Sequence, residues 1–435
     1  MKKLNFSRSS SQSLVANMAQ QGFAMLQFML VVRLLTPTDL GEWAMFLTLT
    51  SMVEMGRLGL VQNALVHFST HQPVARPQLA SAALVFSLGA NVVGLLLLLG
   101  LSVGMSDIWQ MPGLSHLFWC YAPLSLLQAV LKTLEGLRMA DSDFRSLVIS
   151  YTVFGGFYLV FTLFLPFFTS SVSNLALLAG QFAATILSLG ILYFYQKKNW
   201  QFGKIEKQWL RQMFRFGRYG MGTNLCSMLF QRADLFLLSA FVAPSAVATY
   251  NVATRLISYL DFPLNALGLA LMPRLSAVHQ AQNTEGVARL YEKSVGGLLA
   301  LTLPMTVGVC LAAPVLVQIV AGQSFLAAAP LIQILALAGL IKPFGRVFGV
   351  TLDAIGQPIW NFRMLLLSMV ITLIFNVLLI PKAGVWGAAV ASSLSVVVTI
   401  LLGQRLLQRW LDVRLESVVN AVFESYKVTY LVSKR

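Results

Sequence analysis

Long apolar runs separated by short polar segments make up nearly the whole chain. A helix needs about 20 predominantly apolar residues to cross a lipid bilayer. Twelve runs are near or above that length, and one of them includes five consecutive leucines, Leu95 to Leu99. The pattern therefore predicts twelve membrane-spanning helices, over residues 14–32, 42–66, 79–105, 114–131, 146–168, 173–195, 219–241, 246–272, 294–320, 326–355, 364–380 and 384–403.

The start of the chain lacks the pattern of a cleavable signal peptide. Polar residues follow Lys2 and Lys3 as far as Ser13, and no short apolar core with a small-residue cleavage site comes after them. We therefore expect the first helix to remain in the mature protein.

The composition fits an all-α integral membrane protein. Of the 435 residues, 57% are hydrophobic and 11% are charged, against about 45–50% and about 25% in ordinary soluble domains. These values exclude a soluble enzyme, a disordered scaffold and a disulfide-rich secreted domain. Cys120, Cys226 and Cys310 lie singly within apolar runs, so we predict no disulfide framework, no metal site and no cofactor.

Basic residues set the expected orientation. The chain has 31 Lys and Arg against 16 Asp and Glu, and loops rich in Lys and Arg stay on the cytoplasmic side of a membrane. If the N-terminus is cytoplasmic, 24 of the 31 fall on that side, five fall within spans, and only Arg33 and Lys382 are external. We expect both termini in the cytoplasm. We do not attribute the net charge of +15 to nucleic-acid binding.

The longest polar stretch covers residues 196–218, carries seven of these basic residues and leaves six spans on each side. We predict an N-terminal six-helix half over residues 1–195, a basic cytoplasmic linker over 196–218 and a C-terminal six-helix half over 219–404. Residues 405–435 are predicted to form an amphipathic cytoplasmic tail, which either lies on the inner membrane surface or continues the last helix.

The two halves resemble each other when the sequence is shifted by 207 residues. Residues 36–43 then align with residues 243–250, Pro37 matches Pro244, and Gly41 matches another small residue. Each segment is the short external turn between the first two helices of its half. An even number of helices per half predicts parallel halves, with the substrate site in a central cavity between them.

Charged residues inside the predicted spans indicate the candidate site, because a charge within the bilayer is costly. Several cations at similar depth repel one another unless they share a water-filled cavity or an anionic ligand. Arginine also suits phosphate oxygens, because its guanidinium presents a fork of donors. We therefore predict a cationic central cavity, with the substrate-binding residues Arg57, Arg232, Arg255, Lys342 and Arg346.

Three acids share these spans, namely Glu54, Asp234 and Asp261. Glu54 lies three residues before Arg57, which places both on one helix face and close enough to pair. Each acid either carries a coupling ion or forms a fixed ion pair, and the sequence leaves both roles open. We expect Pro343 to bend the tenth span. Charges nearer the span ends are expected to be structural: Glu42, Arg274 and Asp353.

Several loose motifs carry a resemblance to a known family. They are the polar start before an uncharged first helix, residues 33–43 (RLLTPTDLGEW), the pair Gly56 and Gly59, residues 231–234 (QRAD) and residues 248–251 (ATYN). These features resemble the oligosaccharide flippases of the polysaccharide-transporter group, within the multidrug/oligosaccharidyl-lipid/polysaccharide exporter superfamily. At residue 248 this chain has alanine where the family commonly has glycine.

The resemblance implies a transporter rather than an enzyme. Such flippases move undecaprenyl-diphosphate-linked oligosaccharides, the repeat units of O-antigen, capsule or exopolysaccharide, across the bacterial inner membrane by alternating access. The implied partners are the lipid-linked oligosaccharide, the membrane, H⁺ or Na⁺ as the driving ion, and a polysaccharide polymerase and glycosyltransferases. The cationic cavity would hold the diphosphate.

Three other functions are compatible with a multi-span chain of this kind. A drug/cation antiporter of the same fold needs a more acidic cavity than five buried cations and three buried acids provide. A membrane glycosyltransferase or polymerase needs catalytic groups on a sizeable external loop, whereas the acidic pair Asp141 and Asp143 is predicted inside. A lipid II flippase of the same superfamily would usually have more than twelve spans. The chain also lacks a P-loop motif, so we do not expect direct use of ATP.

Overall fold

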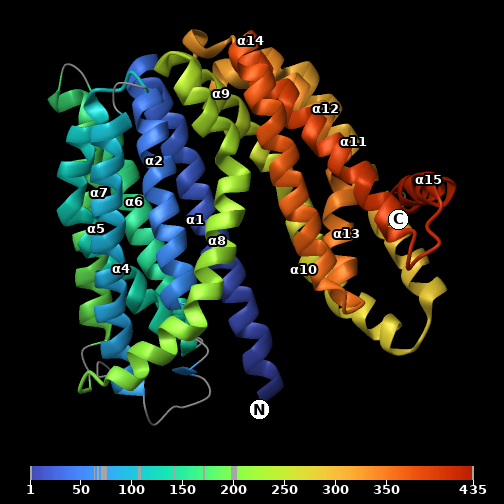
Figure 1. The fold of residues 1–435 in the computed structure, drawn as a ribbon, viewed down its shortest axis with the longest axis horizontal. Coiled ribbons are helices and arrows are strands. Elements are labelled where there is room, and N and C mark those ends of the chain that lie inside the picture. Colours follow the sequence, from blue (N-terminus) through green and yellow to red (C-terminus); the bar gives the residue numbers. More distant parts are fainter. Residues whose placement is uncertain are drawn as a thin grey trace. The chain divides into compact units, whose positions relative to one another are not determined.

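The computed structural model describes residues 2–62, 64–65, 68–69, 76–105, 109–141, 143–169, 172–196 and 203–433. All regular elements in these residues are helices, as Figure 1 shows. Seven of them are long and apolar enough to cross a membrane, and α12 (Ala328–Gly339) with α13 (Lys342–Ala354) make an eighth span if the bent pair is counted as one. The predicted all-helical, multi-span fold is confirmed.

The chain forms two compact units, and the first comprises Met1–Arg232 with Ala243–Ala248. Within it, α1 packs on α6, α4 on α5, and α7 on both α5 and α6. The helices of this unit are α1 (Lys2–Leu34), α2 (Pro37–Arg57), the π-helix η1 (Leu58–Gln62), α4 (Arg76–Met105), α5 (Gly113–Ala140), α6 (Phe144–Phe168), α7 (Asn174–Gln196) and most of α8 (Lys207–Phe241).

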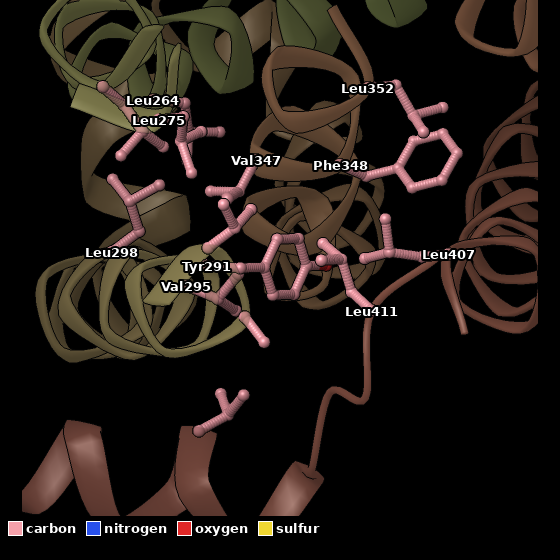
Figure 2. Close-up of a cluster of buried hydrophobic side chains, with 14 of the residues drawn as sticks. Leu264, Leu275, Tyr291, Val295, Leu298, Val347, Phe348, Leu352, Leu407 and Leu411 are labelled. Atoms are coloured by element: carbon pink, nitrogen blue, oxygen red, sulfur yellow. The ribbon is translucent and has the colours of Figure 1, made fainter. Parts of the chain in front are cut away.

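The second unit comprises Ala233–Val242 and Thr249–Arg435. Its core lies where α10, α11, α13 and α14 meet, and Figure 2 shows Tyr291, Val347 and Leu411 pointing into it. The hydroxyl of the fully buried Tyr291 lies 2.8 Å from the side-chain amide of Gln404. Besides α12 and α13, this unit holds most of α9 (Pro244–Ser258), η3 (Tyr259–Asp261), α10 (Phe262–Gln280), α11 (Thr284–Val320), η4 (Gln323–Phe325), α14 (Pro358–Leu407) and α15 (Leu415–Ser433).

The 50-residue helix α14 is a hairpin of two limbs. The Thr399 hydroxyl donates to the Ser368 hydroxyl at 3.1 Å, although 31 residues of one straight helix would separate them by about 46 Å. The chain reverses at Gly384, whose φ of 53° and ψ of −128° are not helical. A positive φ suits glycine because it has no Cβ. The first limb (358–383) and the second limb (385–407) correspond to the predicted eleventh and twelfth spans.

The twelve predicted spans are helical over most of their described residues, apart from short turns such as residues 326–327 and 340–341 in the tenth span, but three boundaries were wrong. α1 begins at Lys2, twelve residues early, and α5 continues past residue 131 to Ala140. The polar stretch expected to be a solvated loop is helical from Lys207, because Trp209 and Met213 are buried against Leu60 and its neighbours. Residues 197–202 of that stretch lie outside the described residues.

The two turns matched by the 207-residue shift have the same build. Two residues separate α1 from α2 and α8 from α9, and both α2 and α9 begin on a proline, Pro37 and Pro244. The Thr36 hydroxyl oxygen accepts a hydrogen bond from the Asp39 backbone N–H at 3.2 Å and so caps α2. Gly41 contacts the backbone of Pro244 where a Cβ would overlap the carbonyl, so a small residue at this position does allow two backbones to approach.

A second close approach joins α8 to the π-helix that follows α2. Gly217 lies against the carbonyl of Leu60, and Gly59 lies against the backbone of Gly220, in both cases where a Cβ would overlap backbone atoms. The Asn224 side chain on the same helix donates to the Met55 carbonyl at 3.0 Å. Helix α8 is therefore held against the end of α2 by direct backbone contact.

Gly217→Ala should destabilise the first unit, because the added methyl would collide with rigid backbone at Leu60. Overpacking of this kind costs about 1–3 kcal/mol, so the variant should unfold at a lower temperature in detergent micelles. Gly222→Ala is the matched control on the same helix, since its Cβ would meet no atom within 4 Å. Equal melting temperatures for the two variants would contradict the described contact.

Candidate functional site

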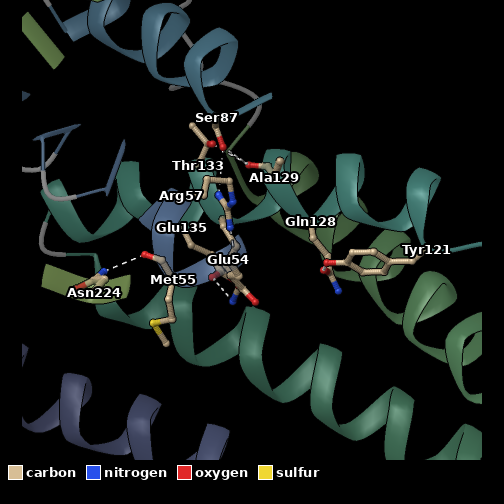
Figure 3. Close-up of polar contacts among 11 residues, drawn as sticks. Glu54, Met55, Arg57, Ser87, Tyr121, Gln128, Ala129, Thr133, Glu135 and Asn224 are labelled. Carbon is tan, nitrogen blue, oxygen red and sulfur yellow. Dashed lines mark hydrogen bonds and ion pairs between the residues drawn. The ribbon is translucent and has the colours of Figure 1, made fainter. Parts of the chain in front are cut away.

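A buried polar cluster in the first unit surrounds Arg57, the last residue of α2 (Figure 3). Arg57 is only 5% exposed. Its Nη1 donates to the Ser87 hydroxyl of α4 at 3.1 Å, and that hydroxyl donates to the Ala129 carbonyl of α5 at 3.3 Å. One guanidinium thus links three helices, and a buried charge is retained only with such partners.

Glu54 is the acidic partner of Arg57, as the three-residue spacing predicts. Its Oε1 lies 3.7 Å from Nη2 of Arg57. The Glu54 side chain is 35% exposed, whereas that of Arg57 is 4% exposed. The pair therefore runs from the packed interior, at Arg57, to a partly exposed carboxylate at Glu54.

Sequence reasoning missed a second buried ion pair, between Lys132 and Glu135 on α5. Nζ of Lys132 lies 2.9 Å from Oε2 of Glu135, and Oε1 of Glu135 accepts from the Ser150 hydroxyl of α6 at 2.9 Å. Ser150 in turn lies 2.9 Å from the Ser188 hydroxyl of α7. The sequence prediction ends the fourth span at residue 131, because the charge of Lys132 interrupts the apolar run. The opposite charge three residues later was the available signal, since such a pair can stay within a helix bundle.

The two pairs form one electrostatic network. Glu54 and Glu135 both act on Arg57, and both act on Lys132. The network therefore has as many anions as cations. The sequence predicts five cations and three acids within the spans. Adding Lys132 and Glu135 gives six cations and four acids, so cations still exceed acids by two.

Asp234 of α8 is the centre of a polar cluster in the second unit. Its Oδ2 accepts from the hydroxyl of Tyr250 at 2.5 Å, and its Oδ1 accepts from the Leu235 N–H at 2.8 Å. The hydroxyl of Ser392, on the second limb of α14, lies 3.5 Å from Oδ2. Tyr250 is fully buried. An acid held by hydroxyl groups from two further helices can bind a proton or a small cation.

Of the other predicted site residues, Arg232 belongs to the first unit. The second unit holds Arg255, Asp261, Lys342 and Arg346. Lys342 forms an ion pair with Asp261, whose two carboxylate oxygens are 2.9 and 3.0 Å from Nζ. Arg255 is a hydrogen-bond partner of Tyr259, and Arg346, one turn after Lys342, is exposed. Lys342 is therefore neutralised by an acid of its own unit.

Helix α13 begins at a bend, as the proline in the tenth span predicts. The axes of α12 and α13 differ by 43°, and Pro343 occupies the first turn of α13. The bend places the ammonium of Lys342 at the start of a new helix.

The charges expected to be structural have local partners or face outward. Glu42 accepts a hydrogen bond from the backbone of Gly113 at the start of α5, and Asp353 accepts from the Asn361 amide at 3.1 and 3.2 Å. Arg274 is exposed. Within the described ranges, no three His, Cys, Asp or Glu side chains are grouped to hold a metal ion.

Residues 30–330 match the family described as polysaccharide biosynthesis protein. The chain belongs to this family. A relative from Haloferax volcanii, named probable low-salt glycan biosynthesis flippase Agl15, is 23% identical over 95% of this chain and 86% of its own length. The protein is therefore a membrane transporter of polysaccharide biosynthesis and not an enzyme.

Two solved structures share the fold. An inward-facing multidrug resistance MATE family transporter covers 92% of this chain and 98% of its own, with a TM-score of 0.73 and 14% identity. The lipid II flippase MurJ, in an inward closed conformation, covers 97% of this chain and 92% of its own, with a TM-score of 0.73 and 12% identity. At these identities the likeness shows the fold and says nothing of the cargo.

Glu135→Ala should strongly destabilise this family member, because it leaves Lys132 buried without its anion. Removing one partner of a buried pair costs about 3–5 kcal/mol, which a thermal unfolding curve in detergent would register. Lys132→Met combined with Glu135→Leu should recover most of the loss. The control is Glu285→Ala, which breaks an exposed pair with Arg289 and should cost less than about 1 kcal/mol. Equal effects of the two single variants would contradict the buried network.

Proposed function

We propose that the protein is a flippase that moves a diphosphate-linked oligosaccharide carried on undecaprenol across the bacterial inner membrane. The observation that carries the proposal is the Arg57–Glu54 pair, in which a buried guanidinium meets a partly exposed carboxylate. The family and its flippase relative support a lipid-linked glycan as cargo. A diphosphate is the part of such a cargo that an arginine recognises best.

The proposed binding step is an exchange of anions on Arg57. A phosphate oxygen of the cargo replaces the Glu54 carboxylate, which at 3.7 Å is a loose partner. Ser87 keeps the guanidinium oriented during the exchange, because its hydrogen bond uses a different nitrogen.

Asp234 is the proposed site of a coupling ion in the second unit. Carboxylate, hydroxyl and amide oxygens are the ligands that hard cations prefer, and Asp234 and Ser392 supply the first two. Asn376 is fully buried, with no partner for either atom of its amide. The contact between Ser368 and Thr399 fixes the register of the two limbs of α14. Eight residues nearer the turn on each limb, Asn376 stands opposite residues 391 and 392. An ion at this level would give the amide oxygen a partner.

Alternating access between two halves, residues 1–195 and 219–404, is the proposed transport mechanism. The 207-residue repeat supports parallel halves around a central cavity, to which Arg232, Arg255, Lys342 and Arg346 would contribute further positive charge. The distribution of Lys and Arg supports cytoplasmic termini. Glycosyltransferases that build the same glycan would act before this step, and a polymerase would act after it.

A drug antiporter is the second candidate, because a MATE transporter shares the fold. Its cationic cargo would require an excess of acids in the cavity. The predicted cavity residues together with the Lys132–Glu135 pair comprise six cations and four acids. This balance favours an anionic cargo.

Loss of the cavity arginines should abolish transport without preventing membrane insertion. Arg57→Ala, Arg232→Ala and Arg346→Ala should each stop glycan export in cells that lack their own flippase, while the amount of membrane-inserted protein stays normal by immunoblot. Arg57→Lys should recover little activity, since lysine lacks the donor fork. Arg289→Ala removes an exposed cation of α11 and is the matched control. Normal export by all three variants would refute the cavity assignment.

Asp234→Asn should uncouple transport from its driving ion. In proteoliposomes, the wild-type protein should respond at least tenfold to an imposed H⁺ or Na⁺ gradient, and the variant should not respond to either. Asp353→Asn changes an exposed acid of the same unit and should leave the response intact. A full gradient response by Asp234→Asn would exclude this residue from coupling, while leaving the arginine test unaffected.

A further inference from the structure

Two tryptophans and two arginines form a cluster at the ends of the α14 hairpin, away from the turn at Gly384. Trp360 and Arg363 are on the first limb. Arg409 and Trp410 directly follow the second limb. The two indole rings meet edge to face, with centroids 5.9 Å apart at 61°. We call these four residues the Trp–Arg cluster.

Both indoles of the Trp–Arg cluster are anchored to the core of the second unit. Trp360 and Trp410 pack against the buried residues that include Leu407 and Leu411, two side chains that Figure 2 shows at the edge of that core. The guanidinium carbon of Arg363 lies 4.7 Å from the centroid of the Trp360 ring, and that of Arg409 lies 5.9 Å from it. Stacking on an indole leaves the N–H groups at the rim of a guanidinium available to an anion.

The two arginines lack a negative partner. Both are exposed, and neither forms an ion pair with any carboxylate in the described part of the chain. The acids closest in sequence are engaged elsewhere, Asp353 with Asn361 and Asp412 with Arg414. Two cations gathered around one ring, with no acid between them, are complementary to a phosphate.

Exposed apolar surfaces lie near the Trp–Arg cluster, as expected beside a site that binds a lipid headgroup. Next to Arg363, the first limb exposes an apolar surface suited to acyl chains, formed by Ile359, Phe362, Leu366, Leu367 and Val370. Helix α15 exposes a second apolar surface, formed by Leu415, Val419, Phe423 and Tyr426. Trp is enriched where hydrocarbon meets headgroups, and long arginine side chains near helix ends extend their charge to the same level.

Helix α15 is fixed to the same unit, so its exposed apolar surface is a stable part of this region. The Arg414 backbone N–H donates to the buried Glu292 of α11 at 2.7 Å. Gly296 of α11 approaches Val418 and Ala421 so closely that a side chain on it would collide with them. A helix with one face on the protein and an apolar face outward is suited to lie at the membrane interface.

We propose that the Trp–Arg cluster binds the phosphate of an anionic glycerophospholipid of the surrounding bilayer. Arg363 and Arg409 hold the phosphate oxygens, and the apolar surfaces of α14 and α15 contact the acyl chains. Its residues are none of those assigned to cargo binding or ion coupling, so this lipid site is independent of the proposed function.

The test uses the purified full-length protein in a neutral detergent with added phosphatidylglycerol or phosphatidylcholine. Phosphatidylglycerol should raise the melting temperature of the wild-type protein, and phosphatidylcholine should not. The double variant Arg363→Gln, Arg409→Gln should bind phosphatidylglycerol at least tenfold more weakly by native mass spectrometry, while its melting temperature without lipid stays normal. Lys382→Gln is the matched control, because it removes a cation at the turn of the same hairpin.

Three outcomes would overturn the proposal. Equal phosphatidylglycerol binding by wild type and the double variant would show that the arginines are not the site. Equal stabilisation by glycerol phosphate would show that a free phosphate, and not a lipid, is recognised. Stabilisation by a polyprenyl diphosphate but not by phosphatidylglycerol would make the cluster a cargo site. If the double variant fails to fold, the double variant Arg363→Lys, Arg409→Lys replaces it. Phosphatidylglycerol binding at wild-type strength by that variant would count against a site specific for guanidinium groups.

Discussion

A charged side chain inside a helix bundle in lipid must have a partner, and this requirement accounts for much of the described structure. Arg57 joins α2 to α4 and, through Ser87, to α5. Glu135 joins α5 to α6 and, through Ser150, to α7. The same side chains that are neutralised by an ion pair within their own helix thus hold neighbouring helices through hydrogen bonds to serine hydroxyls. Replacing either Arg57 or Glu135 would therefore loosen helix packing as well as break an ion pair.

Apolar run length was enough to predict the helices, because the thickness of the hydrocarbon core fixes the length of a span. The hairpin at Gly384 and the bend before Pro343 also follow from local sequence, since glycine and proline act on the backbone where they stand. The ends of helices were harder to predict. Nothing local to Trp209 indicates that the helix begins before it, because the partner that buries it, Leu60, is far away in sequence.

The candidate site was predictable only in part, for a related reason. The pairing of Glu54 with Arg57 depends on spacing along one helix and could be read directly. The partners of Asp234 and Lys342 come from other elements, Tyr250 and Ser392 in one case and Asp261 in the other. Lys132 was assigned to a loop because its charge was counted without Glu135. A rule that ends a span at its first charge fails wherever an opposite charge follows one turn later.

The contact between α8 and the π-helix after α2 has a mechanical consequence. Side chains on packed helices form ridges and grooves, and their interlocking fixes the crossing angle. At Gly59, Gly217 and Gly220 the two backbones touch without side chains between them. Such a contact sets a hard limit on how closely the two helices approach, because backbone atoms cannot change rotamer to make room. Arg57 immediately precedes this contact along the chain, so a side chain added at Gly59 or Gly217 would also disturb the end of α2 that carries its guanidinium.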